Sequence, residues 1–200
     1  MKPGIAFFDF DGTITKKDTL LEFIKFSKGL PLFWFGFAVC SPWILIWKLN
    51  IISNQAAKEK VLSFFFRGMK IETFEQLSLA FAKQKIPALL RTKAKAEIKL
   101  LQEQKFTTVV VSASPGNWIE PLAREYNMPV IATTLEIKDG LLTGKIASKN
   151  CHGTEKVRRI KEQYDLSIYQ TVYAYGDSSG DVPMLQLADK AFMKPFRDHQ

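Results

Sequence analysis

Short strand-like apolar runs alternate with helical patterns along this chain of 200 residues. Residues 4–10 (GIAFFDF) are apolar and lead into Asp11-Gly12, which predicts a buried strand followed by a loop. From residue 18 to about residue 104, apolar positions recur at helical spacing. Further strand-like runs follow at residues 106–112, 130–134, 171–175 and 191–193, with helical segments at residues 117–126, 154–164 and 182–187.

Prolines and glycines divide the helical block. The expected helices cover residues 19–26, an apolar run up to residue 49, and residues 54–66, 73–84 and 88–104. Breaks are expected near Pro31, Pro42, Gly68 and Pro87, because these residues end or bend helices. Farther along, Asp139-Gly140 between two apolar runs predicts a β-hairpin.

Strands that alternate with helices predict an α/β fold in which helices cover both faces of a parallel sheet. We therefore expect a Rossmann-like parallel sheet core with an inserted all-helical cap domain. The helical block lies between the first and second expected strands. Residues 1–16 and 89–200 would form the core, and residues 17–88 would form the cap.

The composition is that of a globular chain, with 46% hydrophobic and 24% charged residues, and it excludes intrinsic disorder and a disulfide scaffold. The net charge of +8 favours anionic partners, and residues 16–88 contribute +6 of it through 11 Lys or Arg and 5 Asp or Glu. The first eleven residues lack the pattern of a secretory signal. Cys40 and Cys151 match no metal or redox spacing, so we expect a cytoplasmic setting.

One segment of the expected cap, residues 29–47 (GLPLFWFGFAVCSPWILIW), has no charged residue and is flanked by Lys28 and Lys48. Its length makes it a marginal candidate for a membrane span. An apolar segment in a basic region is typical of a surface that lies on an anionic membrane. A buried helix in the cap of a soluble enzyme would give the same pattern. The tryptophans that favour a membrane interface are Trp34, Trp43 and Trp47.

Acidic side chains follow two of the expected strands. Asp9 and Asp11 lie two residues apart at the end of the first strand, so they point to the same side. Asp177 and Asp181 follow the strand at residues 171–175. Four carboxylates at the ligand-binding edge of a parallel sheet would repel one another unless a cation lay among them. Oxygen ligands of this kind suit Mg²⁺.

Phosphate-binding features follow the second expected strand. The run Val111-Ser112-Ala113-Ser114 offers hydroxyls and backbone N–H groups before a helix, which suits phosphate oxygens. Lys156 is the candidate cation, because a basic residue in a first helical turn runs against the usual preference for acids. Each feature alone occurs in ordinary turns and caps, but their order along the chain argues against coincidence.

Together these residues resemble the four motifs of the haloacid dehalogenase superfamily of phosphohydrolases. The motifs are Asp9-Phe10-Asp11-Gly12-Thr13, Ser112, Lys156 and Gly176-Asp177-Ser178-Ser179-Gly180-Asp181. The helical insertion after the first motif resembles the cap of the phosphoserine-phosphatase-like subfamily. The resemblance spans nearly the whole chain and implies a hydrolase of phosphoric monoesters.

The resemblance also implies a role for each catalytic residue. Asp9 would attack phosphorus and form an aspartyl-phosphate. Asp11 would protonate the leaving alcohol and then take a proton from the attacking water. Ser112, Ala113 and Lys156 would bind the phosphoryl oxygens.

The implied cofactor is Mg²⁺. Its ligands would be Asp9, the backbone carbonyl of Asp11 and Asp177. Asp181 would hold a metal-bound water or orient Lys156. A single membrane crossing by residues 29–47 would separate Asp9 from the other motifs, so that segment would be a buried hairpin, a re-entrant element or an interfacial helix.

Substrate choice in this superfamily lies in the cap, where Asp18 is the candidate specificity residue. Phosphoserine phosphatases carry Glu at this position for an ammonium group and an arginine-containing cap motif for a carboxylate, which has no clear counterpart in residues 54–68. The cap more closely resembles that of bacterial phosphatidylglycerophosphate phosphatases. Those enzymes share the Asp, a long apolar stretch and a run that matches residues 151–157 (CHGTEKV).

We therefore expect a lipid phosphate such as phosphatidylglycerophosphate as the substrate, with phosphoserine or histidinol phosphate as soluble alternatives. A phosphotransferase and a non-catalytic membrane-binding module are the rival functions. Nucleic acid is not expected as a partner, because the lysines at positions 93, 95 and 99 lie on the solvated face of an amphipathic helix. The expected enzyme is cytoplasmic and contacts the membrane peripherally through its cap.

Overall fold

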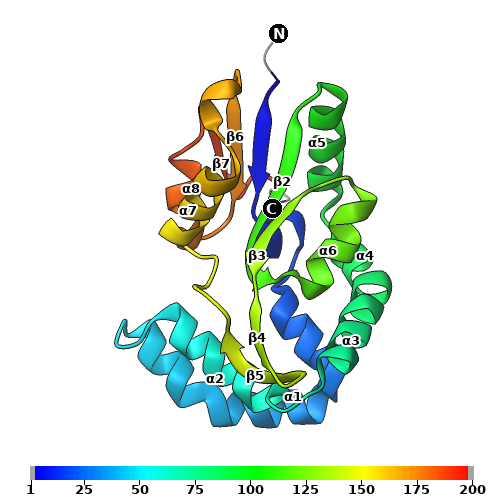
Figure 1. The fold of residues 1–200 in the computed structure, drawn as a ribbon, viewed down its shortest axis with the longest axis vertical. Helices are drawn as coiled ribbons and strands as arrows, with labels where there is room; N and C mark the ends of the chain where they lie inside the picture. Colours follow the sequence, from blue (N-terminus) through cyan, green and yellow to red (C-terminus); the bar gives the residue numbers. More distant parts are fainter. Residues whose placement is uncertain (1–2, 198–200) are drawn as a thin grey trace.

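A parallel sheet of five strands lies at the centre of the computed structural model, which describes residues 3–197. The strand order is β3-β2-β1-β6-β7 (Figure 1). The strands are β1 (Ile5–Phe8), β2 (Thr107–Pro115), β3 (Val130–Thr133), β6 (Val172–Gly176) and β7 (Lys190–Met193). The predicted α/β fold with a parallel sheet core is confirmed.

The central strand β1 is buried on both faces and pairs in parallel with β2 and β6. Its alternate residues enter two apolar clusters. Ala6 and Phe8 belong to the cluster that continues into the cap, whereas Ile5 and Phe7 belong to the cluster on the opposite face. A strand with no polar side chain therefore leads directly to Asp9 at the carboxyl edge of the sheet.

Helices cover both faces of the sheet, with α5 (Thr92–Glu103) and α6 (Gly116–Glu125) on one and α7 (Thr154–Gln163) and α8 (Val182–Leu185) on the other (Figure 1). The helix expected over residues 88–104 is interrupted, since α4 (Ile86–Leu89) ends before α5 begins. Leu90 forms a β-bridge with Thr15, and the Arg91 N–H donates to the Ile14 carbonyl. These contacts hold the chain in an extended conformation between the two helices.

The inserted segment is helical and contains α1 (Thr19–Lys48), α2 (Asn54–Phe66) and α3 (Ile71–Gln84). The two helices expected over residues 19–49 are joined in α1, which kinks at Gly29, where φ is +78°. The break expected near Pro42 is wrong. Pro42 has no N–H for the Ala38 carbonyl, but the Ser41 hydroxyl donates to that carbonyl at 2.7 Å and so satisfies it.

A hairpin from the second half of the chain packs against the cap helices. It consists of β4 (Leu135–Lys138) and β5 (Leu141–Ile146) and turns at Asp139-Gly140, as predicted, with positive φ at both turn residues. The Gly68 N–H donates to the Leu142 carbonyl, which fastens the hairpin to the end of α2. The cap layer thus includes strands from outside residues 17–88, and the domain division at those residues stays a prediction.

An aromatic cluster packs the cap on the core. Phe23 of α1, Phe74 and Phe81 of α3 and Trp118 of α6 are all fully buried, and their rings contact one another. The Trp118 indole N–H donates to the Thr19 hydroxyl at 3.0 Å. The first turn of α1 is therefore held in place by the core.

Beyond Gly29, α1 is largely exposed. Within residues 3–197 it is the helix long and apolar enough to cross a membrane, which by itself is weak evidence for membrane contact. One side, with Phe33 and Cys40, is buried, while Trp34 is 66% and Phe35 62% exposed. The alternative of a helix buried within the cap is therefore wrong for this segment.

Candidate active site

The turn after β1 places two of the motif residues. Asp9 is buried, and its backbone N–H donates to the Tyr175 carbonyl at 2.9 Å. The chain then turns through η1 (Phe10–Ile14), a single π-helical turn in which Gly12 has a φ of +79°. A side chain at Gly12 would collide with the Asp177 carboxylate, so this glycine lets the loop lie against Asp177.

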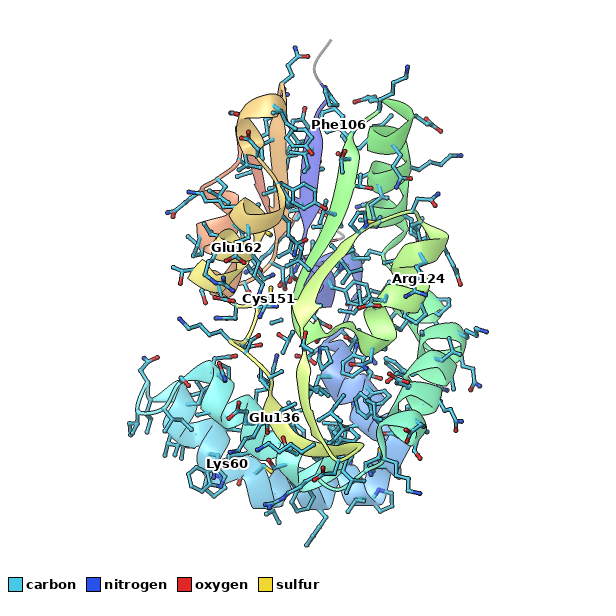
Figure 2. All side chains as sticks on the ribbon, in the orientation of Figure 1. Lys60, Phe106, Arg124, Glu136, Cys151 and Glu162 are labelled. Carbon is cyan, nitrogen blue, oxygen red and sulfur yellow. The ribbon has the colours of Figure 1, made fainter. Side chains whose placement is uncertain are left out.

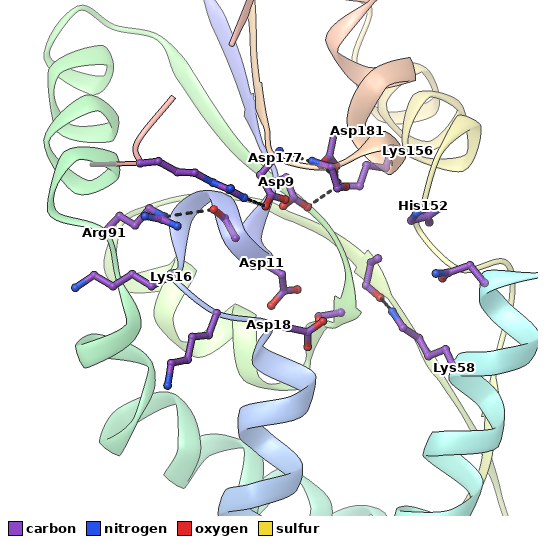
Figure 3. Close-up of a pocket in the computed structure, with 17 residues that line it drawn as sticks. Asp9, Asp11, Lys16, Asp18, Lys58, Arg91, His152, Lys156, Asp177 and Asp181 are labelled. Atoms are coloured by element: carbon purple, nitrogen blue, oxygen red, sulfur yellow. Dashed lines mark hydrogen bonds and ion pairs between the residues drawn. The ribbon is translucent and has the colours of Figure 1, made fainter. Parts of the chain in front are cut away.

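Lys156 is buried next to Asp9 and Asp181 and connects the motifs (Figure 3). Its buried ammonium donates to Asp9 Oδ1 at 2.6 Å, to Asp181 Oδ1 at 2.7 Å and to the Val111 carbonyl at 2.8 Å. Burial alone would lower the pKa of Lys156, but the two carboxylates raise it above its ordinary value. Lys156 is therefore charged at neutral pH, and its positive charge stabilises the negative charges of Asp9 and Asp181.

The Asp9 carboxyl has a raised pKa. Burial raises this pKa to about 7, with further contributions from Asp181 and Asp11, although Lys156 lowers it. A second cation next to Asp9 would favour its charged form. Asp9, Asp177 and Asp181 each place a carboxylate oxygen within 4.8 Å of the others. An all-oxygen group of this kind fits Mg²⁺.

Asp181 uses both of its oxygens within the protein. Oδ1 accepts from Lys156, and Oδ2 accepts from the Asp177 N–H, the Ser178 N–H and the Ser178 hydroxyl. Asp177 is partly exposed and forms an ion pair with Arg197 at 3.0 Å. Asp9 and Asp177 thus fit the expected carboxylate ligands, whereas Asp181 orients Lys156 and the loop around Asp177.

Asp11 is held by the first turn of the cap. Its Oδ1 accepts from both the N–H and the hydroxyl of Thr19, each at 2.6 Å, and its Oδ2 accepts from the Ser112 hydroxyl at 3.4 Å. Asp18 lies beside it as the N-cap of α1 and accepts from the Leu21 N–H at 3.1 Å. Asp18 is accessible to solvent within the cleft, but the many protein atoms around it and the nearby Asp11 charge raise its pKa to about 6. The candidate specificity residue therefore also stabilises a helix end.

The expected phosphate-binding run lies beside these acids. Ser112 is fully buried, and its hydroxyl oxygen accepts from the Ser114 N–H at 3.0 Å. Ala113 lines the cleft, and its carbonyl accepts from Lys58 Nζ at 2.9 Å. The structure thus brings Ser112, Ala113 and Lys156 into one site with Asp9, and their phosphate-binding roles stay predictions.

Lys58 of α2 is a site residue that the sequence analysis missed. It points into the cleft from the cap (Figure 3) and also lies 3.4 Å from Asn150 Oδ1. Burial lowers the pKa of Lys58, while Asp18 and Asp11 raise it less strongly. Its position could have been noticed, because Lys58 precedes the buried Val61, Leu62 and Phe65 at spacings that place it on the covered face of α2.

A cleft of about 1080 Å³ lies between core and cap, and its lining includes Asp9, Asp11, Asp18, Lys58, Lys156 and Asp177. Arg91 lies at its edge and donates to the Gly12 and Thr15 carbonyls, so it supports the η1 turn. Lys16 and Lys17 are exposed at the rim. The arrangement offers carboxylates for a divalent cation and ammonium groups for an anion in the same cleft.

Comparison with known proteins defines the class. The family model of haloacid dehalogenase-like hydrolases matches residues 6–186, and the chain belongs to this family. Protein CicA of Caulobacter vibrioides is 33% identical over 198 residues, which cover 98% of this chain and 88% of that protein. Phosphoserine phosphatase SerB2 of Mycobacterium tuberculosis is 36% identical over 99 residues, 48% of this chain and 24% of that protein.

A solved structure shares the fold. The phospho-aspartyl intermediate analogue of a phosphoserine phosphatase superposes with a TM-score of 0.69 at 18% identity, and covers 94% of this chain and 84% of that one. The family match and the phosphatase relatives identify this chain as a phosphatase of the haloacid dehalogenase-like family.

Proposed function

We propose that this phosphatase hydrolyses a phosphomonoester through an aspartyl-phosphate on Asp9, with Mg²⁺ as its cofactor. The observation that carries the proposal is the buried contact of Asp9 with Lys156, which is shared with Asp181. It holds Asp9 Oδ1 in place, while the Thr13 hydroxyl donates to Asp9 Oδ2 at 3.2 Å. A carboxylate fixed at both oxygens is oriented for attack on phosphorus.

In this proposal the reaction has two displacements at phosphorus. Asp9 forms a bond to phosphorus as the bond to the leaving oxygen breaks, and Asp11 gives that oxygen a proton. Asp11 then takes a proton from the water that attacks the aspartyl-phosphate, which releases phosphate and restores Asp9. Lys156 and Ser112 hold the phosphoryl oxygens. Mg²⁺, bound by Asp9, the Asp11 carbonyl and Asp177, would neutralise charge on the phosphoryl group.

The substrate that we propose is a lipid phosphate such as phosphatidylglycerophosphate. Its support is the exposed apolar part of α1 and the position of Lys58, which would meet a second anionic group of such a lipid, its phosphodiester. A cytoplasmic enzyme that contacts the membrane peripherally fits this proposal.

Phosphoserine is the second candidate. Asp18 and Lys58 lie together in the cleft with opposite charges, which would suit the ammonium and carboxylate of an amino acid. The partial match to a phosphoserine phosphatase points the same way.

Phosphate release in the presence of Mg²⁺ tests the proposal. The substrates are phosphatidylglycerophosphate in mixed micelles, phosphoserine, histidinol phosphate and an aryl phosphate. Asp9→Asn should lose turnover by at least about a thousandfold, because it removes the nucleophile. Asp139→Asn, in the exposed hairpin turn, is the matched control and should keep the wild-type rate.

Retention of a tenth of the wild-type rate by Asp9→Asn would remove Asp9 from the role of nucleophile. Selective turnover of the lipid supports the first substrate, and selective turnover of phosphoserine replaces it with the second. Transfer of phosphate to added alcohols in preference to water would make the enzyme a phosphotransferase. Absence of turnover on every substrate, with Mg²⁺ bound, would favour the non-catalytic module.

A further inference from the structure

The part of α1 beyond Gly29 has apolar residues on all sides, but the rest of the protein covers only one of these sides. Gly36 lies where a side chain would collide with the Phe64 and Phe65 rings, so this glycine lets α2 pack closely against α1. The opposite side, which we call the outer face of α1, consists of Leu32, Trp34, Phe35, Val39 and Leu45, with Trp43 at its edge, and all six are exposed. A helix that is apolar all round normally lies in a protein core or in a membrane.

The exposed area is large for a soluble domain. Taking about 150–250 Å² for a whole aromatic side chain, Trp34, Phe35 and Trp43, which are 66%, 62% and 41% exposed, leave on the order of 300 Å² uncovered. That value already approaches the largest apolar patch of a typical monomer, and the aliphatic residues of the outer face add to it. Side chains project from this lower end of the molecule, away from the core (Figure 2).

The charge around the outer face has one sign. Between Glu22 and Glu59 the chain has no acidic residue, and its charged residues there are all lysines. Lys48 ends α1, and the exposed Lys60 stacks over the Trp43 ring at 4.5 Å. A second copy of this chain would bring the same lysines together and repel, whereas anionic headgroups would attract them.

Both ends of the apolar segment are tied to the active site, so it cannot cross a bilayer. At one end the first turn of α1 holds Asp11 through Thr19. At the other end, Lys58 of α2 returns to the Ala113 carbonyl. A membrane contact by this helix would therefore place it along the bilayer surface with α2 above it, in the manner of an interfacial element.

We propose that the outer face of α1 docks on an anionic lipid bilayer. The helix axis would lie parallel to the membrane plane, with Trp34 and Phe35 at the depth of the acyl boundary and Lys48 and Lys60 at the headgroups. This surface stands independently of the proposed phosphatase reaction, because none of its residues takes part in the catalytic contacts.

Docking would bring the cleft close to the headgroups. The exposed Leu49 and Ile51 belong to the turn between α1 and α2, and Asn54, three residues after Ile51, lines the cleft. Three residues span at most about 11 Å, so the rim of the cleft lies within that distance of the apolar surface. A phosphate group carried by a lipid could therefore reach the site without leaving the membrane.

Vesicle sedimentation tests the proposal. The probes are phosphatidylcholine vesicles with and without phosphatidylglycerol, and the protein is the full chain. Wild type should bind the anionic vesicles at least about tenfold more tightly than the neutral ones, and high salt should weaken the binding. The double variant Trp34→Gln, Leu45→Gln should lose at least about tenfold in affinity for the anionic vesicles.

The matched control is Leu100→Gln with Ile168→Gln, which replaces two exposed apolar residues of the core. It should bind vesicles as wild type does. Circular dichroism and hydrolysis of an aryl phosphate should be the same for all three proteins, which separates lost docking from lost folding. Vesicle binding without any phosphatase activity would refute the proposed function and leave the docking surface intact.

Two results would overturn the docking proposal. The first is equal binding of wild type and the Trp34→Gln, Leu45→Gln variant, or no binding of wild type to anionic vesicles. The second is a wild-type dimer in analytical ultracentrifugation that this variant converts to monomers, since the outer face would then belong to a second copy of the chain.

Discussion

Replacing the Asp9 carboxylate should stabilise the metal-free protein while it abolishes turnover. The raised pKa of about 7 means that the folded state binds the Asp9 proton more tightly than the unfolded chain, whose ordinary value is 3.8. The stability of the metal-free wild type should therefore fall as pH rises from about 4 to about 7, and this loss is complete above pH 7. Asp9→Asn is neutral at every pH and avoids this loss.

The magnitude follows from the shift. Each pKa unit corresponds to about 1.4 kcal/mol, so a rise of about three units sets an upper bound of about 4 kcal/mol at pH 8. Relaxation around the buried charge reduces the expected gain to about 2 kcal/mol. Lys156 keeps its contacts with Asp181 and the Val111 carbonyl in the variant, so its ammonium is not left unpaired.

Urea unfolding followed by tryptophan fluorescence in EDTA measures this effect. The free energy of unfolding of Asp9→Asn should exceed that of wild type by about 2 kcal/mol at pH 8, and the difference should be less than half as large at pH 5. Saturating Mg²⁺ should stabilise wild type and leave the variant nearly unchanged. A variant less stable than wild type at pH 8 in EDTA would refute the reasoning about the buried Asp9 charge.

Three further substitutions, two of them paired with a control variant, test neighbouring parts of the structure. Gly12→Ala and Gly140→Ala both place a side chain at positive φ and should each cost about 1–2 kcal/mol in unfolding experiments. In calorimetric titration, Gly12→Ala should lower Mg²⁺ affinity at least about tenfold and Gly140→Ala should not, because only the methyl group at position 12 displaces Asp177. Equal Mg²⁺ affinities of the two variants would contradict the assigned metal site. Lys58→Met should raise KM at least about tenfold with a smaller change in kcat, and Lys83→Met on α3 should change neither; a main effect on kcat would place Lys58 in the chemical step instead. Glu155→Gln should lower the free energy of unfolding by about 1 kcal/mol, a value that allows for screening by solvent. The reason is that hydrogen bonds from Arg158, and secondarily from Arg159, hold the pKa of Glu155 at about 2. This difference should be full above pH 4.5 and should disappear as pH falls towards 2, and a difference that does not depend on pH would contradict it.

The parallel sheet, and the position of the motif residues at one edge of it, follow from the local pattern of apolar and polar residues. A run such as residues 4–10 has a strong preference for a buried strand, and the carboxyl ends of parallel strands share one edge. The sequence therefore predicted that Asp9, Ser112 and Asp177 lie together. Contacts that depend on tertiary geometry were not predictable in the same way.

Three features of the structure could not be predicted from the sequence alone. The helix continues through Pro42 because the Ser41 hydroxyl satisfies the Ala38 carbonyl, a compensation that spacing alone does not reveal. Lys58 reaches the cleft because α2 returns towards the core, which depends on the packing of α1 against α2. Burial of the segment after Gly29 was as compatible with the sequence as exposure, since both call for apolar residues.

The β4–β5 hairpin makes the cap layer of this enzyme discontinuous in sequence. Gly144 of β5 approaches Ser63 of α2 so closely that a side chain there would meet the backbone, and the Ser63 hydroxyl donates to the Gly144 carbonyl. A chimera that received only residues 17–88 from a relative would place a foreign helix against this hairpin. Exchange of residues 135–146 in the same step would restore the fit. Residues 17–88 and residues 135–146 should therefore change together in evolution, although they are far apart in the sequence.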